Sequence, residues 1–220
     1  MILRLTKKDI LTEDTRAYSF EADNKFDFLP GQFVLLKQPG DVQKNARSFS
    51  MANAPHAEKI TFLMKHLPEG HISGLLAEAP LGTPLEASVP LGRFTLQETD
   101  TDRVFVATGT GLAPIMSFIE HAATIQPSDQ PPFEILFGCR NEQRLFWTEK
   151  LPTTALITLS QPSQTWTGLT GRVTDHIPTV AAEHPDAAWY LCGSAEMIKE
   201  VRQQLLERGV EPAQIHFEIY

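Results

Sequence analysis

The residues best suited to chemistry are those of GTGLAP, Gly109 to Pro114, which follow a run typical of a buried strand and open a run typical of a helix. Glycine at such a turn lets the backbone approach a ligand closely, and the first helical turn offers unpaired N–H groups and a positive dipole end. This combination favours a nucleotide pyrophosphate, and Pro114 suits a first helical turn. A tight turn that needs glycine for its own geometry explains this motif equally well when it is taken alone.

Two further stretches occupy comparable places in the sequence. FGCR, ending at Arg140, and CGS, Cys192 to Ser194, also follow buried runs. Ligands of an open parallel sheet bind beyond the carboxyl ends of its strands, so the three strand ends are expected to converge on one crevice. Cys192 alone would be explained as a small apolar residue at a strand end. The convergence of three ends favours a binding site.

A fourth candidate is NARSFSMANAP, residues 45–55, which follows the strand-like run GQFVLLK. It is too polar for a core strand and too apolar for an ordinary loop. Taken alone, a strand with a surface arginine and serine ends would explain it. It presents together the side chains of Arg47, Ser48, Phe49 and Ser50.

The elements that must position these residues differ between the two halves of the chain. In the first half, ILRLTKK, RAYSFEA, GQFVLLK, KITFLMK and TPLEASV are rich in β-branched, aromatic or alternating residues, with turn signals such as Pro30-Gly31 between them. Several short strands at this spacing predict an antiparallel β barrel or sandwich.

After QETDTDR the pattern changes to buried strands that alternate with helices. RVFVAT, FEILFGC, TALITLS and AWYLCG predict strands, while APIMSFIEHAATI and AEMIKEVRQQLLERG carry apolar residues at helical spacing. Such alternation implies a parallel sheet with helices on its faces. We therefore predict two domains, an antiparallel β barrel over residues 1–98 and an α/β parallel-sheet domain over residues 99–220.

Composition excludes several classes of function. A formal net charge of −8 argues against nucleic-acid binding. Two cysteines cannot supply the four ligands of an iron–sulfur cluster, and the scattered histidines give no support for a metal site. An apolar run of about 18 residues, which a membrane helix needs, does not occur. The N-terminal residues lack the features of a signal peptide, so we expect a cytoplasmic protein without a membrane partner.

Five motifs, RSFS, GHIS, GTGLAP, FGCR and CGS, in this order and with a barrel before an α/β domain, resemble the ferredoxin–NADP reductase superfamily. The resemblance runs from PGQFV to the C-terminal tyrosine. It is closest to the subgroup that supplies electrons to bacterial oxygenases. It implies that the barrel binds FAD and that the α/β domain binds NAD(P)H.

On the FAD side, the resemblance implies that Arg47 pairs with the pyrophosphate, whose oxygens suit a fork of donors. Phe49 would lie against the isoalloxazine ring, and Ser50 would reach its N5 edge. Taken alone, Ser73 would be explained as the N-cap of the helix GLLAEA, and an N-cap serine can also bind phosphate. The segment that would run beside the ribityl chain and hold the phosphates comprises Met64, Lys65, His66, Gly70, His71, Ile72 and Ser73. Its two histidines are expected to pack or to be solvated, because hydride transfer needs no general base.

On the nicotinamide side, the resemblance implies that Gly109, Thr110 and Gly111 hold the dinucleotide pyrophosphate. Cys192, with Gly193 beside it, would lie close to the hydride path. Tyr220 resembles a terminal aromatic that stacks on the outer flavin face, and Glu218 lies where other members place an acidic residue near the flavin. The residues implied at the reacting centre are Ser50, Cys192, Glu218 and Tyr220.

NADH and NADPH differ by a 2′-phosphate, which normally requires an arginine or lysine cluster. Members that prefer NADPH commonly carry arginine just after the serine that ends the third strand of this domain. Here Ser160 is followed by Gln161 and Pro162, although Arg140 and Arg144 could still contribute. We therefore favour NADH over NADPH.

The resemblance implies a converter in which a hydride passes from nicotinamide to FAD and electrons then leave one at a time. Because the chain has no cysteine cluster, the acceptor is expected to be a separate protein: a ferredoxin, a flavodoxin or an oxygenase component. We expect the reductase to be a monomer. Two alternatives stay open, a flavin reductase that releases reduced free flavin and a module in which NAD(H) regulates a partner without turnover.

Overall fold

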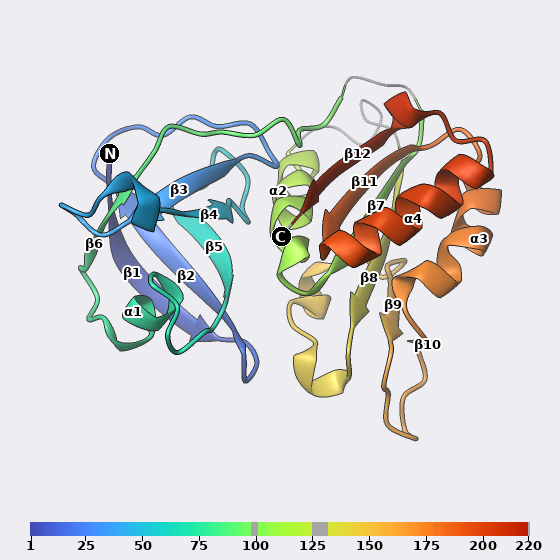
Figure 1. Ribbon diagram of the computed structural model, residues 1–220, viewed down its shortest axis with the longest axis horizontal. Coiled ribbons are helices and arrows are strands. Elements are labelled where there is room, and N and C mark those ends of the chain that lie inside the picture. The colour runs from blue at the N-terminus through green and yellow to red at the C-terminus, as the bar shows by residue number, and fades with distance from the viewer. Residues whose placement is uncertain (98–100, 125–131, 220) are drawn as a thin grey trace.

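The computed structural model describes residues 1–97, 101–124 and 132–219, which form two sheet-based halves lying side by side (Figure 1). The predicted boundary at residue 98 falls outside these described residues, so it stays a prediction.

The first half is a closed antiparallel barrel, as predicted. Its sheet has the order β4-β3-β6-β1-β2-β5. A bridge between Met51 and Phe62, and a 2.8 Å hydrogen bond from the Ala52 N–H to the Thr61 carbonyl, join the two edge strands, so no edge is left open there. The strands are β1 (Ile2–Ile10), β2 (Thr15–Ala22), β3 (Phe33–Lys37), β4 (Arg47–Ser50), β5 (Ile60–Lys65) and β6 (Pro84–Ala87), and the one short α-helix described here is α1 (Ser73–Glu78).

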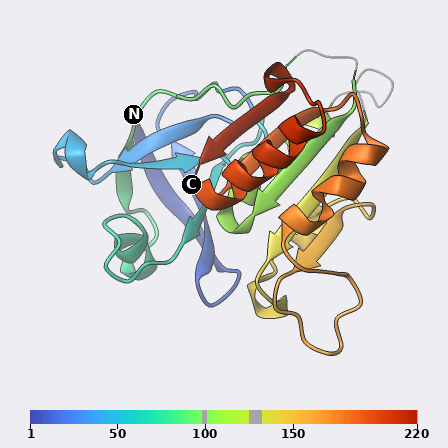
Figure 2. The ribbon, with the colours of Figure 1, turned by 45° about the vertical axis from the view of Figure 1, so that its right-hand side comes forward.

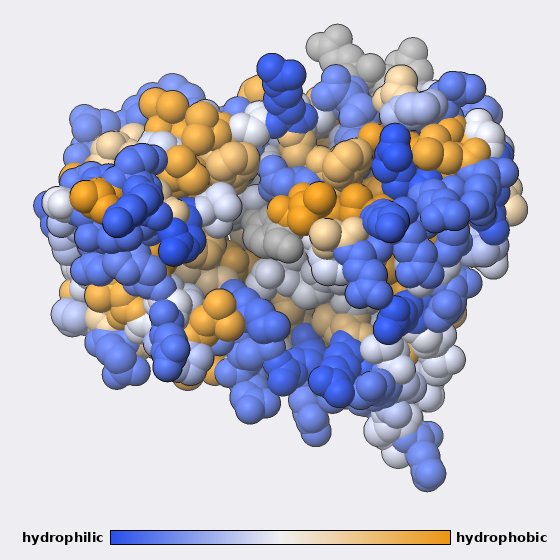
Figure 3. Space-filling model, in the orientation of Figure 1, coloured by the Kyte–Doolittle hydropathy of each residue, from blue (hydrophilic) through white to orange (hydrophobic). Residues whose placement is uncertain are grey.

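The second half is a parallel sheet of order β10-β9-β8-β7-β11-β12, which confirms the predicted α/β class. Helices α3 and α4 cover one face and α2 lies on the other (Figures 1 and 2). The outward surface of α4 is mainly polar (Figure 3). The strands are β7 (Arg103–Thr108), β8 (Phe133–Cys139), β9 (Leu156–Leu159), β10 (Leu169–Thr170), β11 (Ala188–Gly193) and β12 (Ile215–Ile219); the helices are α2 (Leu112–Ala122), α3 (Val173–Glu183) and α4 (Ala195–Glu207).

Short 3₁₀ turns connect several of these elements. They are η1 (Gln43–Asn45), η2 (Gly109–Gly111), η4 (Glu142–Arg144), η5 (Thr148–Lys150) and η6 (Pro212–Gln214). Of these, η2 follows β7 directly and η4 begins three residues after β8 ends, and both therefore shape the carboxyl-end edge of the sheet.

Helix α2 joins the two halves, because it packs between the parallel sheet and the barrel. Phe118 of this helix belongs to one apolar cluster with Phe105 of the sheet and Leu63 of the barrel. The Ser117 hydroxyl also donates a 2.7 Å hydrogen bond to the Asn53 carbonyl. A shared core of this kind fixes how the two halves face each other.

Candidate functional site

One cleft of about 970 Å³ runs between the barrel and the carboxyl ends of the parallel strands. The surface is hollowed between the two halves (Figure 3). It is lined by most of the residues that the sequence predicts for cofactor binding: Arg47, Ser48, Phe49, Met64, Lys65, Gly70, His71, Ile72, Ser73, Gly109, Thr110, Arg140, Ser160 and Gly193. The structure therefore brings motifs from both halves to one space.

Other predicted residues do not line this cleft. Ser50, His66, Gly111, Cys192 and Glu218 are absent from its walls. Tyr220 lies outside the described residues, so its stacking role stays a prediction from the resemblance.

The barrel wall is formed by side chains on β4. The guanidinium of Arg47 is exposed and its Nη1 donates to the carbonyls of Lys44, at 3.1 Å, and Ala46, at 2.9 Å. Phe49 is half-buried and packs edge-on against Phe62, with ring centroids 6.5 Å apart. A cation beside a partly exposed aromatic ring suits a ligand that carries both a phosphate and a flat ring system.

The turn before α1 closes the barrel wall, and its geometry differs from the alternative in which Ser73 is an N-cap. Ser73 is the first residue of α1 rather than its N-cap; Ile72 occupies that place without a side-chain cap. The Ser73 hydroxyl instead accepts a 3.2 Å hydrogen bond from the Leu67 N–H and donates at 3.3 Å to the Leu67 carbonyl. The serine thus ties the loop back on itself, which stabilises the turn at the cleft.

The two histidines of this segment have different surroundings. His71 lines the cleft, and its Nε2 lies 2.6 Å from Oδ2 of Asp41. The hydrogen bond to His71 is the main reason why the pKa of Asp41 is lowered. His66 does not line the cleft, but its backbone N–H donates a 2.7 Å hydrogen bond to the Asp14 carbonyl.

Three predicted residues that do not line the cleft form a group of their own, with Ser50 and Cys192 buried and Glu218 partly buried. The Ser50 hydroxyl donates a 2.9 Å hydrogen bond to Oε1 of Glu218, although the two lie in different halves of the molecule. Burial raises the pKa of Glu218, and the hydrogen bond from Ser50 offsets part of that rise. Glu218 on β12 is the register partner of Cys192 on β11.

Cys192 is 0% exposed, which differs from a position at the ligand surface. Burial and then the charge of Glu218 raise the pKa of its thiol well above the ordinary value, so the thiol stays protonated. Gly193, the next residue, lines the cleft in its place. Contact of Cys192 with a nicotinamide therefore stays a prediction.

The glycines of η2 serve two different purposes. Gly109 has φ 53°, a backbone conformation that the turn requires and that glycine adopts easily. A Cβ at this position would have no neighbour within 4 Å, so the residue faces the open cleft. A Cβ on Gly111 would lie 2.6 Å from the carbonyl carbon of Cys192. Gly111 is therefore needed for close packing of the turn on β11, which explains why it does not line the cleft.

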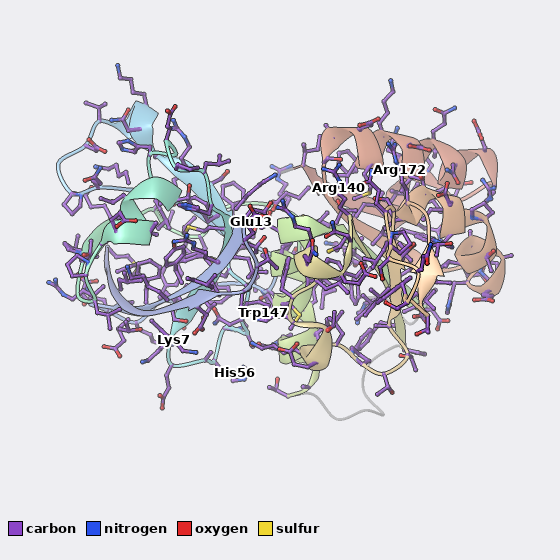
Figure 4. All side chains as sticks on the ribbon, turned by 90° about the horizontal axis from the view of Figure 1, so that it is seen from below. Lys7, Glu13, His56, Arg140, Trp147 and Arg172 are labelled. Carbon is purple, nitrogen blue, oxygen red and sulfur yellow. The ribbon has the colours of Figure 1, made fainter. Side chains whose placement is uncertain are left out.

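The far end of the α/β wall carries two arginines, Arg140 and Arg172 (Figure 4). Arg140 Nε donates a 2.8 Å hydrogen bond to Oε1 of Gln161, and Arg172 Nη1 lies 3.9 Å from Oε1 of Glu196. The sequence did not predict Arg172, nor the cleft residues Asp14 and Phe146. Their positions depend on the tertiary arrangement, and no local motif marks them.

Two features that many proteins have are absent from the residues that the structure describes. No group of three or more His, Cys, Asp or Glu side chains is placed to hold a metal ion there. No helix in the same residues has the length and apolarity needed to cross a membrane.

Comparison with known families defines the class of protein. Residues 2–96 match the family model "Oxidoreductase FAD-binding domain", and residues 105–203 match "Oxidoreductase NAD-binding domain". The barrel is thus an FAD-binding domain and the α/β half a nicotinamide-nucleotide-binding domain, in agreement with the side chains that line each wall. The protein is an oxidoreductase of the two-domain flavoprotein type.

The chain belongs to the ferredoxin–NADP reductase family. It is 31% identical to "Ferredoxin--NADP reductase B" of Sorangium cellulosum over 99% of this chain and 96% of that protein. It is also 31% identical to the "Anthranilate 1,2-dioxygenase electron transfer component" of Acinetobacter baylyi, over 97% of this chain but 65% of that protein. The chain thus spans about two thirds of the length of such dioxygenase components.

Solved structures agree with the fold. The ferredoxin reductase in carbazole 1,9a-dioxygenase superposes with a TM-score of 0.86 at 24% identity, covering 100% of this chain and 68% of that one. The FAD/NAD-binding domain of nitric oxide dioxygenase from Vibrio cholerae gives a TM-score of 0.83 at 18% identity, over 100% and 98% of the two chains. At these identities the likeness supports the fold alone.

Proposed function

We propose that this protein is an NAD(P)H-dependent flavoprotein reductase that passes electrons through FAD to a separate one-electron protein acceptor, a ferredoxin-type protein or an oxygenase component. The observation that carries the proposal is the single cleft, because its barrel wall offers Arg47 and Phe49 while its other wall offers the Gly109 turn. Two nucleotides that share one space can bring their reactive rings together. Relatives of this chain include dioxygenase electron transfer components, which supports the same activity.

The residues of the cleft fit FAD by their chemistry. The exposed Arg47 fork suits a pyrophosphate, and the half-buried Phe49 ring suits a flat aromatic system. When bound, FAD supplies the ability to accept a hydride and release electrons singly. The protein contributes alignment and exclusion of water, and the part-buried Ser50–Glu218 hydrogen bond helps the alignment by joining the two halves.

We further propose that NADH is the preferred nucleotide. A 2′-phosphate requires a cluster of cationic side chains, but the position after Ser160 holds Gln161, which accepts a hydrogen bond from Arg140, and the other arginine at this end, Arg172, lies 3.9 Å from Oε1 of Glu196. The same wall also carries the carboxylates of Glu196 and Glu200. Negative charge there disfavours an added phosphate.

The test is an anaerobic one. The protein is purified without added flavin and mixed with NADH or with NADPH while the visible flavin absorbance is followed. We expect a yellow protein that NADH bleaches faster than NADPH and that then reduces a plant-type [2Fe–2S] ferredoxin. A colourless protein that stays inert after FAD is added would overturn the proposal.

Two other outcomes separate the alternatives. Flavin that is reduced but leaves the protein on gel filtration would indicate a reductase of free flavin. Flavin that is retained while nucleotide binds without bleaching would indicate a regulatory module. A monomeric state, a cytoplasmic location and the lack of nucleic-acid partners stay predictions from the sequence.

A further inference from the structure

The β1–β2 hairpin and the η4 turn carry the ion pairs that join the two halves of the molecule. Arg144 of η4 places Nη1 against Oδ2 of Asp14 and Nη2 3.6 Å from Oε2 of Glu13. Within the residues that the structure describes, no other ion pair links the barrel to the α/β domain. We call Glu13, Asp14 and Arg144 the interdomain clasp.

The Asp14 carboxylate is held in place by residues of its own hairpin, independently of Arg144. Its Oδ1 accepts hydrogen bonds from the hydroxyls of Thr12, at 3.1 Å, and Thr15, at 3.3 Å. Its Oδ2 is thereby left toward Arg144, with Lys65 Nζ 3.9 Å away. Burial alone would raise the pKa of Asp14, but hydrogen bonds from Arg144 and Thr12 and the nearby charges together lower it. The group is therefore an anchored anion.

The clasp also connects to segments that line the cleft. The Asp14 carbonyl accepts the His66 N–H at 2.7 Å, directly before the turn that leads to α1. On the other side, the Arg144 carbonyl accepts a hydrogen bond from Cys139 Sγ at 3.3 Å, at the end of β8. Asp14, Arg144 and Cys139 all line the cleft. Each end of the clasp is thus fixed to one of the two facing walls.

The position of the clasp complements that of the shared core. The core and the Ser117–Asn53 hydrogen bond hold the halves together around α2. Figure 4 shows Glu13 at the boundary between the halves. Side chains of Asp14 and Arg144 keep 25% and 33% exposure, so solvent screens this pair less than a surface pair. The clasp can therefore add an electrostatic restraint on the spacing of the walls to the restraint that the shared core provides.

We propose that Asp14 and Arg144 are positioning residues for hydride transfer: their ion pair sets the spacing between the FAD wall and the nicotinamide wall. This inference rests on the proposed function. Hydride transfer requires the reacting atoms to be held near van der Waals contact, and a misplacement of about 1 Å costs about 100-fold in rate. Loss of the clasp should lower the limiting rate of flavin reduction more than it weakens nucleotide binding.

The experiment measures anaerobic flavin reduction by NADH in a stopped-flow instrument, over a range of nucleotide concentrations. Asp14→Asn and Arg144→Gln should each lower the limiting rate by about tenfold, with bound FAD per protein unchanged. The double variant should be no slower than either single one, because both remove one interaction. Glu13→Gln, at an 86% exposed site, should change the rate by less than about twofold.

The control is Lys7→Gln, which removes one positive charge, as Arg144→Gln does, but from β1 of the hairpin whose turn carries Asp14. Lys7 is 63% exposed, pairs only with Asp9 among the described residues and does not line the cleft. The limiting rate of flavin reduction in Lys7→Gln should therefore equal that of the parent protein. Raising the salt concentration should slow the parent protein at saturating NADH and leave Arg144→Gln unaffected.

Several outcomes would overturn the proposal that Asp14 and Arg144 position the two walls. Limiting rates of Asp14→Asn and Arg144→Gln within twofold of the parent protein would do so. A slow Arg144→Gln beside a normal Asp14→Asn would show that Arg144 acts on the nucleotide directly. If the parent protein itself binds no FAD or is not reduced by NADH, the proposed function fails first, which is a separate result.

Discussion

The two walls of the cleft offer binding groups of different kinds. On the barrel wall they are side chains that project from a strand: Arg47, which is exposed and bonds only to nearby carbonyls, and Phe49, which is half-buried against the barrel core. On the α/β wall the central group is the backbone of η2, whose Gly111 packs directly on Cys192. On the barrel wall the exposed Arg47 can therefore be replaced with little effect on folding. On the α/β wall the η2 turn both faces the ligand and packs against the sheet, so a substitution there affects folding as well as binding.

This difference follows from the two architectures. A barrel strand points alternate side chains outward, so a functional side chain can be added without disturbing the interior. A parallel sheet binds ligands where strands turn into helices, and there the backbone itself must come close to the ligand and to the neighbouring strand. Substitutions on the two walls should consequently fail in different ways.

The largest expected effect is that of Arg47→Ala on FAD binding. Each charge-assisted hydrogen bond to a phosphate contributes about 1.5–3 kcal/mol, so the loss of two should raise the Kd for FAD by at least about 100-fold. Unfolding should change little, because Arg47 is exposed and bonds only carbonyls of its own turn among the contacts described. The measurement is the ratio of flavin to protein absorbance after gel filtration.

Arg47→Lys and Arg208→Ala serve as controls for this prediction. The first keeps the charge but loses the fork, and we expect intermediate retention of FAD. The second removes an exposed arginine at the end of α4, where its Nη1 bonds the Gln204 carbonyl, and it should retain FAD fully. An Arg47→Ala protein that stays fully yellow would remove Arg47 from the flavin site.

On the other wall, Gly111→Ala should mainly damage the fold. The new methyl carbon would lie 2.6 Å from the Cys192 carbonyl carbon and 2.9 Å from the Gly193 nitrogen, so the backbone must shift. Overpacking of this kind costs about 3 kcal/mol. The matched variant Gly109→Ala meets open space and pays only for its positive φ, about 1 kcal/mol.

Urea unfolding and nucleotide titration together test this pair. Gly111→Ala should lower the free energy of unfolding by clearly more than Gly109→Ala does. Gly109→Ala should weaken nucleotide binding in a protein that is still folded, because its methyl group is added in the cleft. Equal losses of stability in the two variants would contradict the distinct purposes assigned to these glycines.

Much of the fold could be predicted because its elements have strong local patterns. RVFVAT and AWYLCG are continuous apolar runs, as expected for strands buried on both faces of a parallel sheet. Helix α3 was missed because Pro178 lies inside it. The proline cannot donate to the Thr174 carbonyl, and the side chain of Gln204 on α4 donates to it instead, at 3.1 Å. Such compensation by a distant residue leaves no local sequence pattern.

In the site, too, residues in local motifs could be predicted, whereas contacts between distant residues could not. The ordered motifs place Arg47, Gly109 and Gly193 in one cleft, and the structure confirms that they line it. The hydrogen bond between Ser50 and Glu218 and the ion pair between Asp14 and Arg144 depend on how the two halves face each other. A single sequence carries no spacing rule for contacts of this range, so these pairs could not be predicted.

The smallest expected effect lies at Glu218, where the two halves meet. Burial raises its pKa in the folded protein above the ordinary 4.5, so the folded state holds the proton more tightly than the unfolded state does. Below pH 4.5 the side chain of Glu218 is protonated in both states and its contribution to the free energy of unfolding is fully present. That contribution is lost as the pH rises through the raised pKa, by up to about 1.4 kcal/mol per pH unit. Glu218→Gln should remove this dependence. Across that range, the free energy of unfolding of the parent protein should fall relative to that of the variant.

Glu86→Gln is the matched control, because it should show the opposite sign. The hydrogen bond from Lys37 lowers the pKa of Glu86 below 4.5, so its contribution is present above pH 4.5 and is lost as the pH falls through the lowered value. Urea unfolding at a series of pH values measures both differences. If the parent protein and Glu218→Gln run parallel between pH 4.5 and 8, Glu218 keeps an ordinary pKa. In that case the partial burial of the Ser50–Glu218 pair does not disfavour the carboxylate.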